Sequence, residues 1–228
     1  MTTLLLIRHG ENNFVGKRLA GWLPGVHLNE KGRQQAGRIA QALAPAPIKA
    51  IYSSPLERAM ETALPLSQAL NLPIQTRTGL CEINFGQWQG KTIKQLSRLK
   101  LWKVVQQTPS QMRFPDGESF AEAQQRLVAD VQAIVSAHDP KDWVACFSHS
   151  DAVRLIVTHF LSIPLDNFQR VSIDTASITV LHLGEHKGTP LVQLGAINYV
   201  PGMSFEPPKE PDKKAKPDKQ HTQTGGQA

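Results

Sequence analysis

The 228-residue sequence has little cysteine, few aromatic residues and no long apolar run, and each shortage excludes a class of protein. Its two cysteines, Cys81 and Cys146, are far apart and show no Cys-x-x-Cys spacing, which excludes a disulfide scaffold or zinc ribbon and suits a reducing cytosol. No apolar run approaches the roughly 18 residues that span a bilayer. The first eight residues lack the basic segment that opens a signal peptide. We therefore predict a cytoplasmic protein with no membrane partner.

The chain is basic, but its basic residues are not gathered into one run. The net charge is +6, and aromatic residues make up only 6% of the sequence. Nucleic-acid binding is not expected, because no long basic segment is interleaved with aromatic residues. A small anionic substrate needs only a few arginines in one pocket, so the charge is compatible with such a substrate. With 40% hydrophobic residues, the chain has enough apolar residues for a sizeable core.

Apolar runs alternate along the chain with stretches of helical periodicity. Strands are predicted at residues 3–7, 48–52, 74–77, 143–147, 177–183 and 191–197. Helices are predicted after Asn29 as an N-cap, after Ser54 as an N-cap with Pro55 at the first helical position, behind a capping box that opens at Ser119, and over residues 153–161. Pro65 is expected to kink or interrupt the second of these helices. This alternation predicts an α/β fold with three α/β/α layers, in which helices flank a mostly parallel central sheet.

Composition divides the chain into one domain and a tail. Residues 1–200 are predicted to form a single domain, whose segment 83–117 is a loop with one or two short helices. Residues 201–228 hold 5 of the 16 prolines together with five lysines, and we predict a disordered Pro/Lys-rich tail because so little apolar surface can be buried there. An exposed edge strand at 191–197 could pair two subunits into a homodimer.

Four cationic or imidazole side chains are predicted to meet at one edge of the sheet. His9 and His149 each follow a predicted strand, at the edge where α/β proteins bind ligands. Arg8 adjoins His9, and Arg58 lies one turn into the helix after the second strand. Arginine forks bind phosphate oxygens in pairs, and an imidazole beside them is either a further phosphate ligand or a nucleophile. These residues therefore predict a phosphate site.

Several spaced motifs, in order, resemble those of the histidine phosphatase superfamily, which has the phosphoglycerate mutase-like fold. The resemblance covers about residues 3–199 and rests on Leu4–Glu11, Gly21–Gly32, Ser53–Ala63, Leu80–Gly90, Asp116–Ser119 and Phe147–His149. It implies that His9 is a nucleophile that takes up the phosphoryl group. It also implies that Arg8, Arg58 and His149 neutralise the phosphate oxygens, and that Glu82 is the general acid and base. Neither a metal nor another cofactor is implied.

Two departures from the family pattern concern the rest of the pocket. Val15 stands where the family commonly has an asparagine, and Asn12 or Asn13 is a candidate to replace that phosphate contact. Two residues after His149, Asp151 stands in place of a glycine, and it is either a second acid or a cap for a helix that opens at Ala152.

Further substrate contacts are expected from the loop before the first helix. Arg18 and Gly21 are predicted to bind substrate. Lys17, Arg18 and Trp22 either contact a second anionic group or are solvated loop residues.

The function predicted from the sequence is a metal-independent phosphatase that hydrolyses a small phosphorylated metabolite through a phosphohistidine on His9. A sugar phosphate, a phosphoglycerate-type acid and a nucleoside-type monophosphate are the substrate classes expected. One alternative is phosphoryl transfer of the phosphoglycerate mutase type, although segment 91–115 is short and carries only two arginines, widely spaced. A non-catalytic phosphate-binding protein is the other. An acyl hydrolase is disfavoured because the sequence has no Gly-x-Ser-x-Gly motif.

Overall fold

A computed structural model describes residues 1–202 and contains one six-stranded sheet with the strand order β3-β2-β4-β1-β5-β6. The strands are β1 (Thr2–Arg8), β2 (Ile48–Ser53), β3 (Ile74–Thr76), β4 (Trp143–Ser148), β5 (Ile178–His186) and β6 (Thr189–Tyr199). β1 to β4 are parallel, whereas β5 and β6 run antiparallel at one side. The predicted α/β fold with a mostly parallel sheet is thus confirmed.

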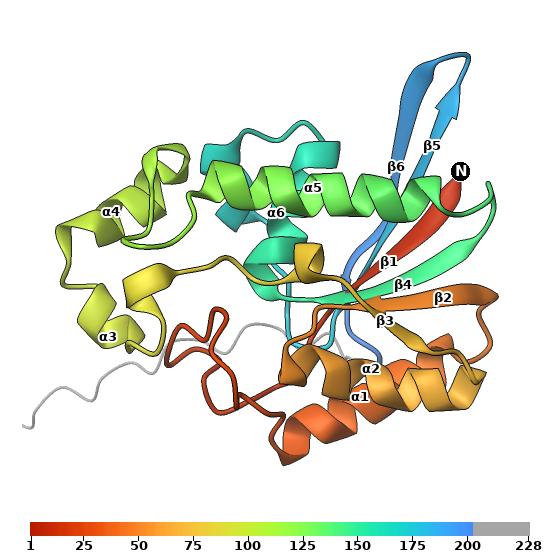
Figure 1. Cartoon of the computed structure of the whole chain (residues 1–228), viewed down its shortest axis with the longest axis horizontal. Coiled ribbons are helices and arrows are strands. Elements are labelled where there is room, and N and C mark those ends of the chain that lie inside the picture. Colours follow the sequence, from red (N-terminus) through yellow and green to blue (C-terminus); the bar gives the residue numbers. More distant parts are fainter. Residues whose placement is uncertain (203–228) are drawn as a thin grey trace, which may run out of the picture.

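Helices cover both faces of the sheet and give it the three predicted layers (Figure 1). Helices α1 (Glu30–Leu43) and α2 (Glu57–Leu70) lie on one face, and α5 (Phe120–Ser136) and α6 (Ser150–Phe160) lie on the other. Strand alternation explains this arrangement, because Leu4 and Leu6 pack in the core under α5 and α6 while Leu5 and Ile7 pack in the core over α1 and α2. Both faces of β1 are therefore buried.

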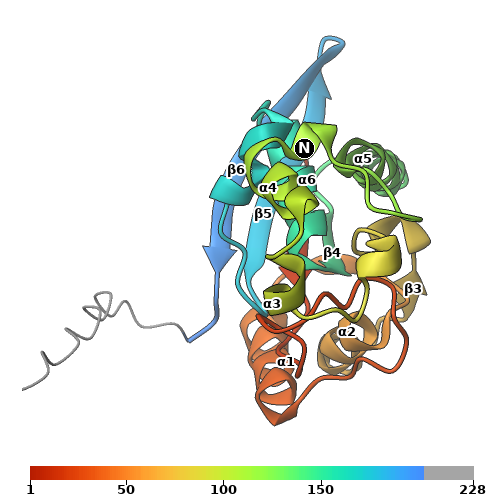
Figure 2. The ribbon, with the colours of Figure 1, turned by 90° about the vertical axis from the view of Figure 1, so that its left-hand side faces the viewer.

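The segment 83–117, here called the cap segment, is built from several short elements. It contains η2 (Gly86–Trp88), α3 (Ile93–Leu96), α4 (Lys100–Gln107) and η3 (Pro109–Gln111), while η1 (Thr78–Leu80) precedes it and η4 (Leu165–Arg170) follows α6. α3 and α4 lie together beyond the end of the sheet (Figure 2). In Figure 1 this is the side toward which the parallel strands run, so the cap segment stands over their carboxyl ends.

Three local predictions need correction. α2 begins at Glu57 with Leu56 as its N-cap, so Ser54 is not the cap; its side chain bonds to a histidine ring instead. α6 begins at Ser150, which places Asp151 in the first turn rather than at the cap. Pro65 does not interrupt α2, which continues to Leu70. A proline removes only one N–H donor, and the packed apolar side of α2 holds the remaining turns together.

The predicted capping box at the start of α5 is present, and its loss has a measurable cost. Ser119 Oγ accepts a hydrogen bond from Glu122 N at 3.2 Å, and Glu122 Oε2 accepts one from Ser119 N at 2.9 Å. Replacing Ser119 with alanine leaves the Glu122 N–H at the helix start without its acceptor, so we expect the free energy of unfolding to fall by about 1 kcal/mol. Urea titration would measure this, with Ser136→Ala at the exposed far end of α5 as the control. Equal stability of the two variants would contradict the prediction.

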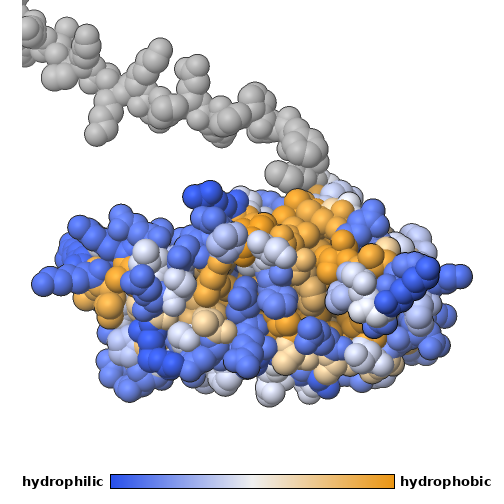
Figure 3. All heavy atoms as spheres, turned by 90° about the horizontal axis from the view of Figure 1, so that it is seen from above, coloured by the Kyte–Doolittle hydropathy of each residue, from blue (hydrophilic) through white to orange (hydrophobic). Residues whose placement is uncertain are grey.

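The β5–β6 hairpin projects from the domain and ends the sheet with an exposed strand (Figure 1). β6 exposes the apolar side chains of Leu191, Val192 and Ile197, and the surface seen from above includes a broad apolar area (Figure 3). The predicted edge strand is therefore real, and its pairing with a second subunit stays a prediction. Among residues 1–202, no helix is long and apolar enough to cross a membrane. From residue 203 on, the tail predicted to be disordered lies outside the described residues.

Candidate active site

Two neighbouring parallel strands place the two histidines side by side. Arg8 at the end of β1 is in register with Ser148 at the end of β4, so His9 and His149 follow at the same edge of the sheet. The His9 backbone N–H donates to the Ser148 carbonyl at 2.9 Å. The centres of the two imidazole rings are 5.3 Å apart. The chain leaves β1 and β4 toward opposite faces of the sheet, which creates a crevice of the kind where α/β proteins bind ligands.

The hydrogen bonding of His9 fixes which ring nitrogen is reactive. Nδ1 lies 2.7 Å from the Gly10 carbonyl oxygen. Because a carbonyl can only accept, Nδ1 carries the proton and Nε2 bears the free lone pair. Burial, together with the cations Arg58 and Arg8, holds the pKa of His9 well below its usual range. His9 is therefore a neutral base with an available lone pair at neutral pH, as a nucleophile requires.

His149 is fully buried and is oriented by Ser54, which the sequence pattern predicts to be a helix cap. Its Nε2 lies 2.8 Å from Ser54 Oγ, at the end of the neighbouring strand β2. Its Nδ1 is buried and finds no hydrogen-bond partner among the described residues. Burial and the nearby Arg58 lower the pKa of His149 well below its usual range.

Two buried arginines complete a cluster of unsatisfied donors. Arg8 Nη1 donates to the Ile173 carbonyl at 2.6 Å, and Arg58 Nη2 donates to the Gly21 carbonyl at 2.8 Å. Arg8 Nε, Arg58 Nε and Arg58 Nη1 are buried without a partner within the described chain, as is His149 Nδ1. Leaving a buried charged donor unpaired is costly, so this cluster is built to receive an anion. The oxygens of a phosphate group would supply the missing acceptors.

The Glu82 carboxylate lies at the start of α6, where it accepts hydrogen bonds from backbone N–H groups. Oε1 accepts from Ile83 N at 3.1 Å and from Ala152 N at 3.0 Å, and Oε2 faces Asp151 N at 3.4 Å. Burial, followed by the charge of Asp151, raises the pKa of Glu82 to about 7. Near neutral pH this carboxyl group is thus present both as an acid and as a base, which suits a residue that gives up a proton and takes one back.

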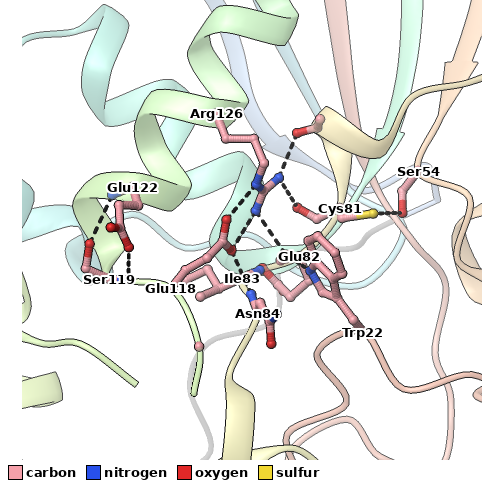
Figure 4. Close-up of polar contacts among 12 residues, drawn as sticks. Trp22, Ser54, Cys81, Glu82, Ile83, Asn84, Glu118, Ser119, Glu122 and Arg126 are labelled. Carbon is pink, nitrogen blue, oxygen red and sulfur yellow. Dashed lines mark hydrogen bonds and ion pairs between the residues drawn. The ribbon is translucent and has the colours of Figure 1, made fainter. Parts of the chain in front are cut away.

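A network around Arg126 fixes the backbone that carries Glu82 (Figure 4). Arg126 donates to three carbonyls of segment 79–82 and forms a two-pronged ion pair with Glu118, at 2.7 and 2.9 Å. Trp22 Nε1 donates to the Glu82 carbonyl at 2.5 Å, and Arg126 stacks on the Trp22 ring. Trp22 thus supports Glu82 from outside the pocket. Glu118 belongs to the Asp116–Ser119 motif that the sequence singled out. The roles of Arg126 and Ser54 in holding Glu82 and His149 were not predicted from the sequence.

The pocket in front of His9 has a volume of about 200 Å³ and is lined by most of the predicted substrate-binding residues. Asn12, Arg18 and Gly21 all line it, together with Val15. Asn12 Oδ1 accepts from the Phe14 N–H, and Arg18 Nη1 donates to the Gly90 carbonyl.

Other residues proposed from the sequence are absent from the pocket wall. Asn13 and Lys17 are exposed and do not line it. Of the two candidate asparagines, Asn12 is therefore the one placed to contact a ligand.

The positive charge of the pocket wall favours an anion. In the described part of the chain, no group of three or more His, Cys, Asp or Glu residues could hold a metal ion. His182, which lies within β5, has its ring nitrogen Nδ1 3.1 Å from Thr3 Oγ1 on the neighbouring strand β1. The cationic wall formed by Arg8 and Arg58 would instead stabilise negative charge that develops on a reacting group.

Comparisons with known proteins show which family the chain resembles in sequence and in fold. Residues 4–194 match the family model of the histidine phosphatase superfamily (branch 1). The sequence is 31% identical to phosphoserine phosphatase 1 of Hydrogenobacter thermophilus, over 84% of this chain and 91% of that protein. It is 30% identical to a 2,3-bisphosphoglycerate-dependent phosphoglycerate mutase of Thermoplasma acidophilum, over 87% and 94%. A mycobacterial glucosyl-3-phosphoglycerate phosphatase superposes with a TM-score of 0.77 at 27% identity, over 86% and 98%.

Proposed function

The chain belongs to the histidine phosphatase superfamily and is a phosphoric monoester hydrolase. We propose the following substrate class and mechanism. The substrate is a small phosphomonoester, and the reaction passes through a phosphohistidine on His9 without a metal ion. One observation carries the proposal: the neutral His9 imidazole shares a pocket with Arg8 and Arg58, which present three buried N–H groups that have no partner within the described chain. The proton-exchanging Glu82, with its pKa raised to about 7, lines the same pocket.

In the first step His9 Nε2 attacks phosphorus, the N–P bond forms and the P–O ester bond breaks. The protonated Glu82 gives its proton to the departing oxygen, which leaves as an alcohol rather than as an alkoxide. Arg8, Arg58 and His149 donate hydrogen bonds to the other phosphate oxygens and hold the phosphorus in line with His9.

In the second step a water molecule attacks the phosphohistidine. The Glu82 carboxylate, left by the first step, takes a proton from the water as the O–P bond forms and the N–P bond breaks. Inorganic phosphate leaves, and both His9 and Glu82 return to their starting states. The two steps need opposite protonation states of the same carboxyl group, which a pKa near 7 makes available.

The names of the relatives support a small-molecule phosphate as the substrate. One relative is named for phosphoserine and another for glucosyl-3-phosphoglycerate. The cap segment strengthens the case for an anionic substrate, because residues 83–115 contain six basic residues and no acidic one. Positive charge beside the pocket raises the rate at which an anion is captured. Arg18 at the pocket lining adds to this positive charge.

Mutase-type transfer is the second candidate because one relative is a phosphoglycerate mutase. The two reactions share the phosphohistidine and differ in what receives its phosphoryl group, water or a second hydroxyl. Incubation with 3-phosphoglycerate would separate them. Release of inorganic phosphate indicates hydrolysis, whereas formation of 2-phosphoglycerate with no phosphate release would indicate that the enzyme is a mutase.

The proposal as a whole is tested by trapping the intermediate. Enzyme in chelator-treated buffer would be mixed with a phosphomonoester panel, quenched and digested, and the peptides analysed by mass spectrometry. We expect phosphate release and a phosphoryl group on His9 that is lost in acid and kept in base, as expected for an N–P bond. Phosphate release that stops after chelation, or a phosphoryl group on another residue, would overturn the mechanism.

The charge of Asp151 sets part of the proton affinity of Glu82, which leads to a pH prediction. Replacing Asp151 with asparagine removes a nearby negative charge that raises the pKa of Glu82. Because the free enzyme needs protonated Glu82, kcat/KM falls as pH rises through that pKa. The alkaline limb of the pH profile should therefore move to lower pH in the variant.

The control for this prediction removes the same unit of charge elsewhere. Asp116 is exposed on the cap segment and does not line the pocket, so Asp116→Asn should leave the profile in place. An alkaline limb that stays fixed or moves upward in Asp151→Asn would contradict the assignment of Glu82 as the acid.

A further inference from the structure

A second cavity adjoins the phosphate pocket. It has a volume of about 340 Å³ and lies between the cap segment and the starts of α5 and α6. Leu19, Phe85, Asp151 and Arg154 line both cavities, so the two spaces meet at these four side chains. Its volume lies in the range of about 300–1,000 Å³ that is usual for small-molecule sites.

Five aromatic rings line this second cavity. Trp88 and Trp102 stack with ring centres 6.1 Å apart, and Phe114 meets the edge of Trp88 at 5.3 Å. Phe120 lies beside Phe114 at the same distance, and Phe85 completes the set. Four of these rings are buried against one another, whereas Trp102 is partly exposed and can pack against a further ring.

Three of the four polar side chains of the wall already have hydrogen-bond partners, and the fourth, Gln106, is exposed. Arg154 Nη1 donates to Asp151 at 2.8 Å, and Arg154 Nε donates to the Val171 carbonyl at 2.8 Å. Gln169 Nε2 donates to the Val105 carbonyl at 3.1 Å. Arg154 is the one cation among the lining residues, and its charge is balanced by Asp151. A carboxylate entering this cavity would lose its water without gaining an unpaired cation, whereas a hydrocarbon group would lose nothing.

The second cavity lies on the side from which the leaving group departs. In-line attack by His9 requires the ester oxygen to lie opposite Nε2, beside the acid that protonates it. Glu82 is that acid under the proposed function. Asp151 contacts the Glu82 carboxylate and Phe85 lies three residues after Glu82 in the sequence, and both line the two cavities. The organic group attached to the ester oxygen is thereby directed into the aromatic cavity.

Resting on the proposed phosphatase function, we propose that the aromatic cavity binds the organic part of the substrate. The preferred substrates are phosphomonoesters of alcohols that carry an apolar ring, rather than phosphorylated hydrophilic acids. The ring is packed against Trp102 and its aromatic neighbours, while the phosphoryl group lies on Arg8, Arg58 and His149.

The test compares esters whose leaving groups are all primary alcohols, so that their intrinsic reactivity is similar. 2-Phenylethyl phosphate, ethyl phosphate and O-phosphoserine would be assayed with the full-length chain. We expect kcat/KM for 2-phenylethyl phosphate to exceed that for either other ester by about tenfold or more, because only this ester buries a ring. Equal values, or a preference for O-phosphoserine, would overturn the inference and leave the phosphatase function intact. Hydrolysis of none of the three would count against the proposed function itself.

Substitutions within α4 check that the preference arises in this cavity. Trp102→Ala removes one wall, and Gln106→Trp places a ring into the space from an exposed position. Each should abolish most of the advantage of 2-phenylethyl phosphate over ethyl phosphate. Leu101→Ala is the matched control, since Leu101 is exposed on the same helix and does not line the cavity. An unchanged preference in both cavity variants would refute the assignment.

Discussion

Phosphate release is expected to fall by a factor of about 10⁴ to 10⁶ when His9 is replaced with alanine, because the nucleophile is lost. No other group can take over its position. His149 is the nearest imidazole, but its Nε2 is engaged with Ser54 and its ring is fully buried. The measurement is single-turnover phosphate release from a generic aryl phosphate in chelator-treated buffer. The same samples would be examined for the phosphorylated peptide, which should disappear together with turnover.

The His9→Ala variant should still bind anions, and this separates a lost nucleophile from a lost fold. Arg8, Arg58 and His149 keep their unsatisfied donors in the variant, so inorganic phosphate should bind with a Kd within about tenfold of wild type. His159→Ala serves as the control, because His159 is exposed on α6. Turnover that survives in His9→Ala would mean that another residue is the nucleophile. Loss of phosphate binding together with turnover would mean that His9 is needed to build the pocket.

The residues at strand ends could be predicted from the sequence because their positions follow from local pattern. The apolar runs before His9 and His149 predict strands, and the structure places the two side chains at the edge that this implies. Asn29 also caps α1 as expected, since its side chain accepts from the Gly32 N–H. In each case the determining contacts lie within a few residues or follow from parallel pairing.

Contacts between distant segments could not be predicted in this way. Ser54 followed by Pro55 has the pattern of a helix start, but the chain uses the Ser54 hydroxyl to orient His149, which lies 95 residues away. Arg126 reads as one polar position on an amphipathic helix, and only the folded chain shows that it holds the backbone of Glu82. Contacts between segments far apart in the sequence decide these roles, and such contacts form only when the layers assemble.

The cap segment was hard to predict because its helices are short. α3 has four residues and α4 has eight, too few for a periodic pattern to stand out or for a helix to be stable alone. Tertiary packing supplies the missing stability, as the stacking of Trp88 on Trp102 joins two of these short elements. The aromatic cavity is a product of the same packing, and nothing in the local sequence spacing indicates it.

Replacing Glu82 with glutamine is expected to slow hydrolysis by an amount that depends on the leaving group. For an alkyl ester, the loss of the general acid should lower kcat/KM by a factor of about 10² to 10⁴. For 4-nitrophenyl phosphate, whose phenolate leaves readily without a proton, the loss should be much smaller in the first step. The amide keeps the shape of the carboxyl group, so the Arg126 network that holds its backbone is expected to persist. Glu185→Gln, on the exposed hairpin, is the control.

The pH profile adds a second, independent readout of the same variant. In wild type, kcat/KM for an alkyl ester should fall above about pH 7, because Glu82 loses its proton as pH rises through its raised pKa. Glutamine does not titrate, so this limb should be absent from the variant. The second ionisation of the phosphate ester, with a pKa of about 6, affects both enzymes equally and cancels in their ratio. An equal loss for alkyl and aryl esters, with the alkaline limb still present, would show that Glu82 shapes the pocket without transferring the proton. Asp151 would then be the acid to test.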